Sequence, residues 1–284
     1  ETVKFMTANK DKPFFAYLSF YSVHTPLISR EDLKKKYQAR KKERELVAKW
    51  GQEHSRKVRL VQEHAVYGGM VEAMDMAVGK VLDGLKTLNL EKNTVVFFMS
   101  DNGGLSTSEG HPTSNLPLRG GKGWMYEGGI REPMMVRWPG VTKPGSVNDS
   151  PITSTDFFPT ILEIADLKLN LPLPTDGVSF TSALRGEKYD RGPMYWHYPH
   201  YGNQGNAPTA AVREGDWKLI EWYEDGKLEL FNLKEDISEK NDLSKKHPDK
   251  VKTLSAKLAN WRKKTGARMP AQNNKFDPNK REGR

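Results

Sequence analysis

The chain has 284 residues, no cysteine and a formal net charge of +9. This length allows one large domain, or a large and a small one, each with its own core. A hydrophobic content of 36% with 10% aromatic residues is too high for a disordered chain. The lack of cysteine excludes disulfides, cysteine-ligated zinc and a cysteine nucleophile within these residues. No apolar run is long enough to span a bilayer, and the opening residues do not resemble a signal peptide.

The positive charge is concentrated in two stretches. Residues 30–59 hold twelve Lys or Arg against five acids, and residues 234–284 hold fifteen against seven. A basic balance raises the possibility of a chain that binds nucleic acid or another polyanion. Because both stretches look peripheral, we favour solvated charged faces and expect no nucleic-acid partner.

The first half of the chain predicts strands and helices in alternation. The apolar, aromatic residues 14–20 are typical of a strand buried on both faces, and Pro26 marks the loop that follows. Residues 31–60 have helical propensity with weak apolar periodicity. From about 61 to 88, apolar residues recur at steps of three and four, which predicts an amphipathic helix with its methionines in the core: Met70, Met74, Ala77, Val78, Val81 and Leu85.

Two further strands are expected at residues 95–99 and 134–138, and Asp156 can cap a helix that runs to residue 165. A helix followed by a buried strand is typical of an α/β fold with a mostly parallel sheet flanked by helices. In such sheets, polar residues that follow a strand line the ligand crevice. The residues after the second strand are therefore candidate site residues.

The pattern changes after a proline-rich stretch at residues 171–176. Residues 210–213, 217–222 and 227–231 predict short strands, and Asp225-Gly226 is a hairpin signal. Residues 248–264 predict a basic amphipathic helix with Val251, Leu254, Leu258 and Trp261 on one face. We therefore expect a small α+β subdomain with an antiparallel sheet over residues 190–284, and a polar, extended or disordered tail beyond Pro270.

Several residues could carry chemistry. Asp101 and Asn102 offer oxygen ligands at a strand end, although the dipeptide alone favours an Asx turn. Residues 119–123 resemble a phosphate-binding loop but lack the Walker pattern. An ordinary flexible loop therefore remains the alternative interpretation. The aromatic and histidine cluster at residues 196–201 could stack on a sugar ring, or it could be half-buried strand packing.

Taken in order, these motifs resemble the C-terminal portion of a formylglycine-dependent type I sulfatase of the alkaline phosphatase-like superfamily. The resemblance runs nearly end to end, and its motifs lie at residues 12–15, 23–26, 70–85, 100–104, 118–123, 126–133, 138–140, 155–160, 215–220 and 229–233. It implies that residues 1–189 are the C-terminal part of the catalytic α/β domain.

The resemblance also implies roles for individual residues. Asp101 and Asn102 match two calcium ligands of the family. Lys122 matches the lysine that contacts the sulfate and stabilises the leaving oxygen, and His24 matches the histidine that assists the departing alcohol. More loosely, Arg119, His197 and His200 are expected to bind substrate.

The family signature, a C/S-x-P-x-R run that is oxidised to formylglycine, does not occur in these residues, nor does the paired-aspartate motif. We therefore expect the nucleophile and the remaining calcium ligands upstream, in a missing N-terminal half, and no sulfatase activity from this chain alone. The expected substrate is a sulfated carbohydrate, and the expected location of the protein is periplasmic or secreted. The alternatives are a phosphodiesterase or phosphonate hydrolase of the same superfamily, or a polyanion-binding chain without enzymatic activity.

Overall fold

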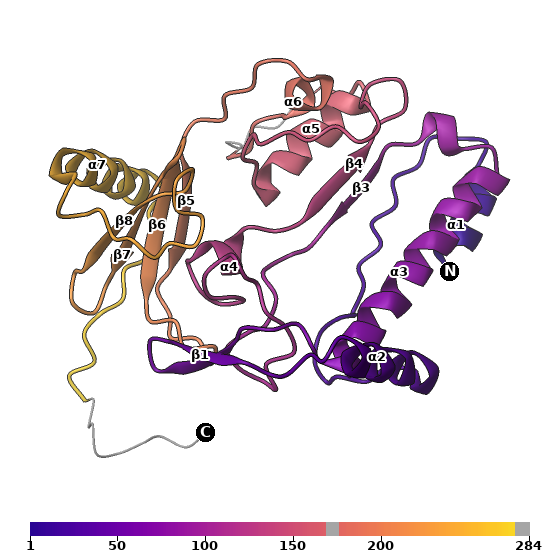
Figure 1. The fold of residues 1–284 in the computed structure, drawn as a ribbon. Coiled ribbons are helices and arrows are strands. Elements are labelled where there is room, and N and C mark those ends of the chain that lie inside the picture. The colour runs from indigo at the N-terminus through magenta and orange to yellow at the C-terminus, as the bar shows by residue number, and fades with distance from the viewer. Residues whose placement is uncertain (169–175, 276–284) are drawn as a thin grey trace.

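The computed structural model describes residues 1–168 and 176–275, so the proline-rich stretch and the end of the predicted tail lie mostly outside it (Figure 1). Helices α1 (Thr2–Asn9), α2 (Glu31–Glu43) and α3 (Ala65–Thr87) gather at one end, and a four-stranded sheet with α7 (Pro248–Thr265) lies at the other. Between them run β3 (Val96–Met99), β4 (Met134–Arg137) and the short α4 (Glu127–Ile130). Within the described residues, no helix is long and apolar enough to cross a membrane.

Helix α3 confirms the amphipathic helix predicted for residues 61–88. His64 caps it, because its Nδ1 accepts a hydrogen bond from the Tyr67 amide at 3.3 Å. Met70 and Leu85 are buried on the predicted face. Gly84 lets Met6 of α1 approach closely, since a Cβ there would lie 3.1 Å from the Met6 methyl group. Packing against α1 and α2 therefore buries the two ends of the predicted apolar stripe, while Met74, Ala77, Val78 and Val81 between them are half-buried.

The helical propensity of residues 31–60 is only partly realised. Helix α2 ends at Glu43, with acids in its first turn and Arg40, Lys41 and Lys42 in its last, as the helix dipole favours. An antiparallel hairpin follows, made of β1 (Trp50–Glu53) and β2 (Arg56–Arg59), with a left-handed residue, His54, in its turn. The prediction was wrong for this segment, because the turn and the cross-strand pairing override local helical preference.

The predicted strands at 95–99 and 134–138 are confirmed as β3 and β4, which pair antiparallel with Phe97 opposite Val136. All strand pairs among the described residues are antiparallel, so they do not themselves contain the expected parallel pairing. Residues 14–20 form no strand in the structure, and Phe15 and Tyr17 are 67% and 84% exposed. A strand needs a partner for its backbone hydrogen bonds, and none of the described strands pairs with this segment.

The helix predicted after Asp156 is also present, as the 3₁₀ turn η2 (Ser154–Asp156) followed by α5 (Phe157–Ile164). The Asp156 side chain does not cap α5 and instead forms a capping box with Thr153 at η2. Asp156 is fully buried and accepts a hydrogen bond from the Thr153 amide. Its charge is paired with Arg191 at 2.8 Å. This contact ties α5 to the segment that follows α6 (Thr181–Arg185) and leads into the C-terminal sheet.

The C-terminal sheet confirms the predicted antiparallel subdomain. Its order is β5 (Met194–Tyr198), β6 (Thr209–Glu214), β7 (Trp217–Trp222) and β8 (Leu228–Asn232). The β7–β8 connection contains Gly226, whose φ of +69° suits the predicted hairpin turn. Leu254 and Leu258 of α7 are fully buried against one face. The aromatic and histidine cluster begins in β5, so its strand interpretation holds for residues 196–198.

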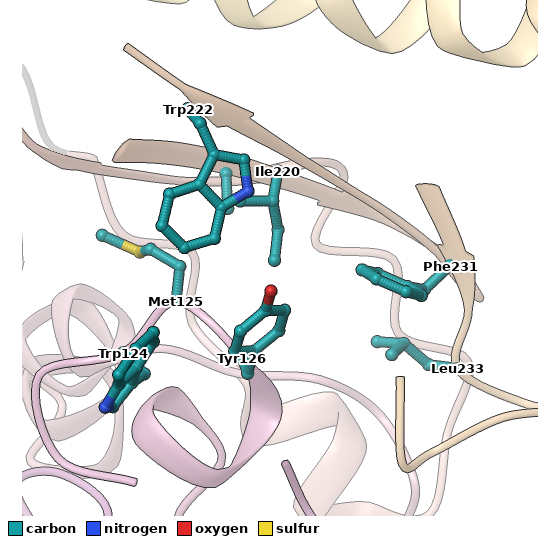
Figure 2. Packing of buried hydrophobic residues seen from close by; sticks show 8 residues of the cluster. Trp124, Met125, Tyr126, Ile220, Trp222, Phe231 and Leu233 are labelled. Atoms are coloured by element: carbon teal, nitrogen blue, oxygen red, sulfur yellow. The ribbon is translucent and has the colours of Figure 1, made fainter. Parts of the chain in front are cut away.

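The other face of this sheet holds the segment that follows Lys122. Trp124, Met125 and Tyr126 pack against Ala211, Ile220, Trp222 and Phe231 of the sheet and against Leu233, which directly follows it. Figure 2 shows this cluster in close-up. Trp124 is 1% exposed and Tyr126 is fully buried. Burying two large aromatic side chains contributes several kcal/mol at ~25 cal/mol per Å² of apolar area. The sheet therefore anchors the chain two residues after Lys122.

A buried group of charges reinforces this anchor. Lys218 of β7 is fully buried and lies 3.0 Å from a carboxylate oxygen of Glu127 and 2.9 Å from one of Glu239. Burial opposes ionisation of Glu127, but the neighbouring Lys218 outweighs it and holds the pKa of that carboxyl below its usual range. The Glu127 amide also donates to Glu239. These three residues, the Lys218 triad, join the C-terminal subdomain to α4.

Candidate functional site

The two predicted catalytic residues meet in the structure. His24 and Lys122 are 98 residues apart, and Lys122 Nζ lies 3.1 Å from His24 Nε2. His24 Nδ1 lies 2.7 Å from the Thr25 carbonyl oxygen, which can only accept a hydrogen bond. Nδ1 therefore carries the proton in the neutral imidazole, and Nε2 accepts from the Lys122 ammonium. The histidine is exposed and the lysine is half-buried, so the pair faces solvent.

Glycines bring the Lys122 loop against the end of strand β3. A Cβ on Gly121 would lie 2.4 Å from the Gly104 carbonyl oxygen, and one on Gly103 would lie 1.8 Å from that of Gly128. The Lys122 amide donates to Gly104 at 3.1 Å. Only glycine allows backbones this close. The loop is therefore a fixed support for the lysine and lies beside the segment that carries Asp101 and Asn102.

Asp101 and Asn102 suit a hard cation. Asp101 is exposed at the end of β3, and the Asn102 amide donates to its carboxylate. Behind them, burial and the charge of Asp101 raise the pKa of Glu132 to about 8, and its buried Oε1 has no hydrogen-bond partner. A bound cation would offset the repulsion between carboxylates that lie this close together. No group of three metal-ligating His, Asp or Glu side chains exists within the described residues, so these two residues can supply only part of a calcium site.

The C-terminal subdomain contributes residues to the surroundings of His24 and Lys122 through the loop that precedes β6. Asn203 Nδ2 donates to Glu109 Oε1 at 2.7 Å, and Thr25 Oγ1 donates to Glu109 Oε2 at 3.2 Å. A Cβ on Gly123, whose φ is +85°, would lie 2.9 Å from Gln204 Oε1. Residues from four distant segments therefore surround the His24–Lys122 pair.

The guanidinium of Arg119 is held by other residues of the chain and does not contact the His24–Lys122 pair. Its Nε and one terminal nitrogen donate to both carboxylate oxygens of Glu53, at 2.9 and 2.8 Å, and its other terminal nitrogen donates to the Glu239 carbonyl at 2.9 Å. Its guanidinium also stacks on the Tyr126 ring at 3.8 Å. The bidentate ion pair raises the pKa of Arg119 despite burial. In this structure all three nitrogens of Arg119 hold the loop, and its expected substrate contact stays a prediction.

His197 also has internal partners. Its Nδ1 lies 2.7 Å from the Tyr223 hydroxyl, and its Nε2 lies 2.8 Å from the Arg268 carbonyl oxygen, so it fastens the segment after α7 to the sheet. Both ring nitrogens thus have internal partners in this conformation, and the expected substrate role of His197 stays a prediction. His200 is exposed, with its ring 5.2 Å from that of Tyr198, and its substrate role stays a prediction.

Sequence reasoning missed several residues of the site. Glu109 and Asn203 lie in loops without a recognisable motif, and only the fold brings them to Thr25. Glu132 follows the Tyr126–Arg131 run, whose charges alone do not reveal that this carboxyl is buried. A weak signal was present for Asn203, because residues 202–206 form a polar, glycine-containing run directly after the aromatic cluster.

Comparison with known proteins agrees with this architecture. The sulfatase family profile matches residues 1–167, and the profile for the C-terminal region of N-sulphoglucosamine sulphohydrolase matches residues 121–264. A sulfatase of Formosa agariphila is 38% identical over 281 residues, which cover 90% of this chain and 47% of that protein.

Solved structures show the same fold. Ps i-CgsB in complex with k-i-k-neocarrahexaose has a TM-score of 0.76 and 30% identity, over 92% of this chain and 52% of that one. BT4656 in complex with D-glucosamine-2-N,6-O-disulfate has a TM-score of 0.60 and 26% identity, over 71% of this chain and 40% of that one. The chain thus spans about half the length of the relatives it matches. With its alkaline phosphatase-like fold, it belongs to the sulfatase family and corresponds to the C-terminal portion of that family.

Proposed function

We propose that the protein carrying these residues hydrolyses sulfate esters of a carbohydrate, with a calcium ion and an upstream formylglycine. The observation that carries this proposal is the contact between Lys122 Nζ and His24 Nε2 beside the β3 end. Because a sulfuryl group is anionic and its leaving oxygen gains charge as the S–O bond breaks, a fixed ammonium and an imidazole are suited to stabilise that charge.

In this proposal, the residues of this chain bind, orient and hold protons. Lys122 donates to a sulfate oxygen, and its glycine-rich loop keeps the ammonium in place. With Nδ1–H held by the Thr25 carbonyl, His24 presents Nε2 to the ester; when Nε2 is also protonated, it would donate that proton to the departing alcohol and leave a neutral imidazole. Asp101 and Asn102 would hold calcium together with residues expected in a missing N-terminal half. Bound there, the cation would supply charge neutralisation for the sulfuryl oxygens.

The carbohydrate substrate is supported by two structural relatives and by the exposed cluster. Ps i-CgsB binds k-i-k-neocarrahexaose, and BT4656 binds a sulfated glucosamine. In this chain, His200 and Tyr201 are exposed in the loop that also supplies Asn203 to the site. An exposed aromatic ring can stack on a sugar face. A secreted or periplasmic location, where sulfated polysaccharides occur, belongs to the same proposal.

Matched esters test the reaction type. The full-length protein should hydrolyse 4-nitrophenyl sulfate with kcat/KM at least ~100-fold above that for 4-nitrophenyl phosphate. Chelation with EGTA should remove the activity, and added calcium should restore it. Sulfated carrageenan and glucosamine oligosaccharides, followed by sulfate release, test the substrate class. Faster turnover of bis(4-nitrophenyl) phosphate, a diester, or of a matched phosphonate ester would favour a phosphodiesterase or phosphonate hydrolase and contradict the proposal.

A further inference from the structure

An exposed carboxylate, Glu109, is held by the residue next to His24. Glu109 accepts hydrogen bonds from Thr25, the immediate neighbour of His24, and from Asn203. Thr25 Oγ1 is itself 3.5 Å from His24 Nδ1. Glu109 has a left-handed φ of +49°, and its neighbour Gly110 has a φ of +88°. The loop therefore places this carboxylate at the site, and two donors from distant segments fix its direction.

No cation among the described residues neutralises the charge of Glu109. Neither of its two partners is charged, and no ion pair within the described residues involves it. Each carboxylate oxygen accepts one hydrogen bond and retains a further lone pair. A carboxylate in this position cannot assist the binding of the sulfuryl group, because like charges repel at this range. Its remaining lone pairs are therefore available to another part of the ligand.

The chemistry of a carboxylate limits what that part can be. An ionised carboxylate accepts hydrogen bonds and donates none, so it pairs well with a hydroxyl or an ammonium group and badly with a second sulfate. In a sugar sulfate, the groups that flank the ester are ring hydroxyls. A hydroxyl adjacent to the scissile ester is therefore the group that Glu109 is suited to bind when the ester lies at His24 and Lys122.

We propose that Glu109 is a specificity-determining residue that accepts a hydrogen bond from a free hydroxyl next to the scissile sulfate and disfavours a second sulfate there. This inference rests on the proposed sulfatase function and names the substrate class more narrowly: sugars whose ester has an unsulfated neighbour. Asn203 is a positioning residue, since it holds the carboxylate from the C-terminal subdomain.

The test pairs changes in enzyme and substrate. For the full-length protein, the best sugar monosulfate from a panel is compared with two derivatives: one lacks the neighbouring hydroxyl, and the other carries a second sulfate on it. The wild type should prefer the parent sugar to each derivative by ~10- to 100-fold in kcat/KM, as expected for a hydrogen bond to a charged group. Glu109→Ala should reduce both preferences to within ~3-fold. Glu109→Gln, which keeps an acceptor and loses the charge, should mainly increase turnover of the doubly sulfated sugar.

Controls separate this inference from the proposed function. Glu187→Gln changes an exposed carboxylate with no side-chain partner in the described structure, and it should keep all wild-type preferences. If the wild type releases no sulfate from any sugar, the proposed function fails. If it releases sulfate but the Glu109 variants keep the wild-type preferences, only the role of Glu109 fails. Asn203→Ala should weaken both preferences while near-ultraviolet circular dichroism stays native, and unchanged preferences in that variant would overturn its positioning role.

Discussion

The two ends of the molecule differ in how completely they bury their apolar residues. In the C-terminal subdomain, sheet residues such as Val212, Leu219 and Leu230 are fully buried, and α7 covers one face. In the first part, Tyr17 is 84% exposed and Met135 of β4 is 61% exposed. Both regions have strand-forming sequences, but only the C-terminal one contains strand partners for all of them. Strand propensity is thus realised where pairing and packing are available.

The largest expected effect concerns the Lys218 triad, where the two regions join. Lys218→Met leaves Glu239 buried without a counter-charge and removes the nearest cation from Glu127, which keeps only Arg213 and Arg131 at 3.6 and 3.9 Å. This change should cost about 3–5 kcal/mol of unfolding free energy. Urea denaturation followed by tryptophan fluorescence measures this, and limited proteolysis should show new cleavage around residues 119–130. The exposed Lys234→Met is the control and should change little. A loss below ~1 kcal/mol in Lys218→Met would contradict the role of the triad.

A matched pair of leucines tests the comparison itself. Leu254 of α7 is fully buried, whereas Leu18 in the unpaired segment is 41% exposed. Leu254→Ala should destabilise the subdomain by ~2–5 kcal/mol through the cavity that it leaves. Leu18→Ala should cost less than ~0.5 kcal/mol in this chain. The denaturation midpoints of both variants measure these losses of stability. Equal losses would mean that the first part is packed as tightly as the C-terminal subdomain.

The sequence alone predicts the C-terminal subdomain well because its signals are local. Alternating residues form β6 to β8, Asp225-Gly226 forms the turn, and the apolar stripe of α7 faces the sheet. Local signals do not predict the hairpin at residues 50–59, because its turn and strand pairing outweigh the helical propensity of its residues. Residues 14–20 show the opposite error, since a strand-like composition does not supply a pairing partner.

The site residues also divide into those that the sequence motifs indicate and those that depend on contacts between distant segments. The resemblance singles out His24 and Lys122, and the structure brings them into contact across 98 residues. The resemblance cannot reveal that Arg119 forms an ion pair with Glu53 or that His197 hydrogen-bonds to Tyr223, because both contacts depend on long-range packing. Glu109 and Asn203 were missed for that reason as well, since neither belongs to a motif.

The central claim is that the Lys122 ammonium stabilises a sulfate ester at this junction. In the full-length protein, Lys122→Ala should reduce kcat/KM for 4-nitrophenyl sulfate by ~10²- to 10³-fold, the usual cost of removing one preorganised donor. Lys143→Ala, at an exposed lysine, is the control and should retain activity. Because Lys122 contacts His24, adding His24→Ala should cost less than the product of the two single losses. A folded Lys122→Ala protein with activity within ~3-fold of wild type would contradict the account.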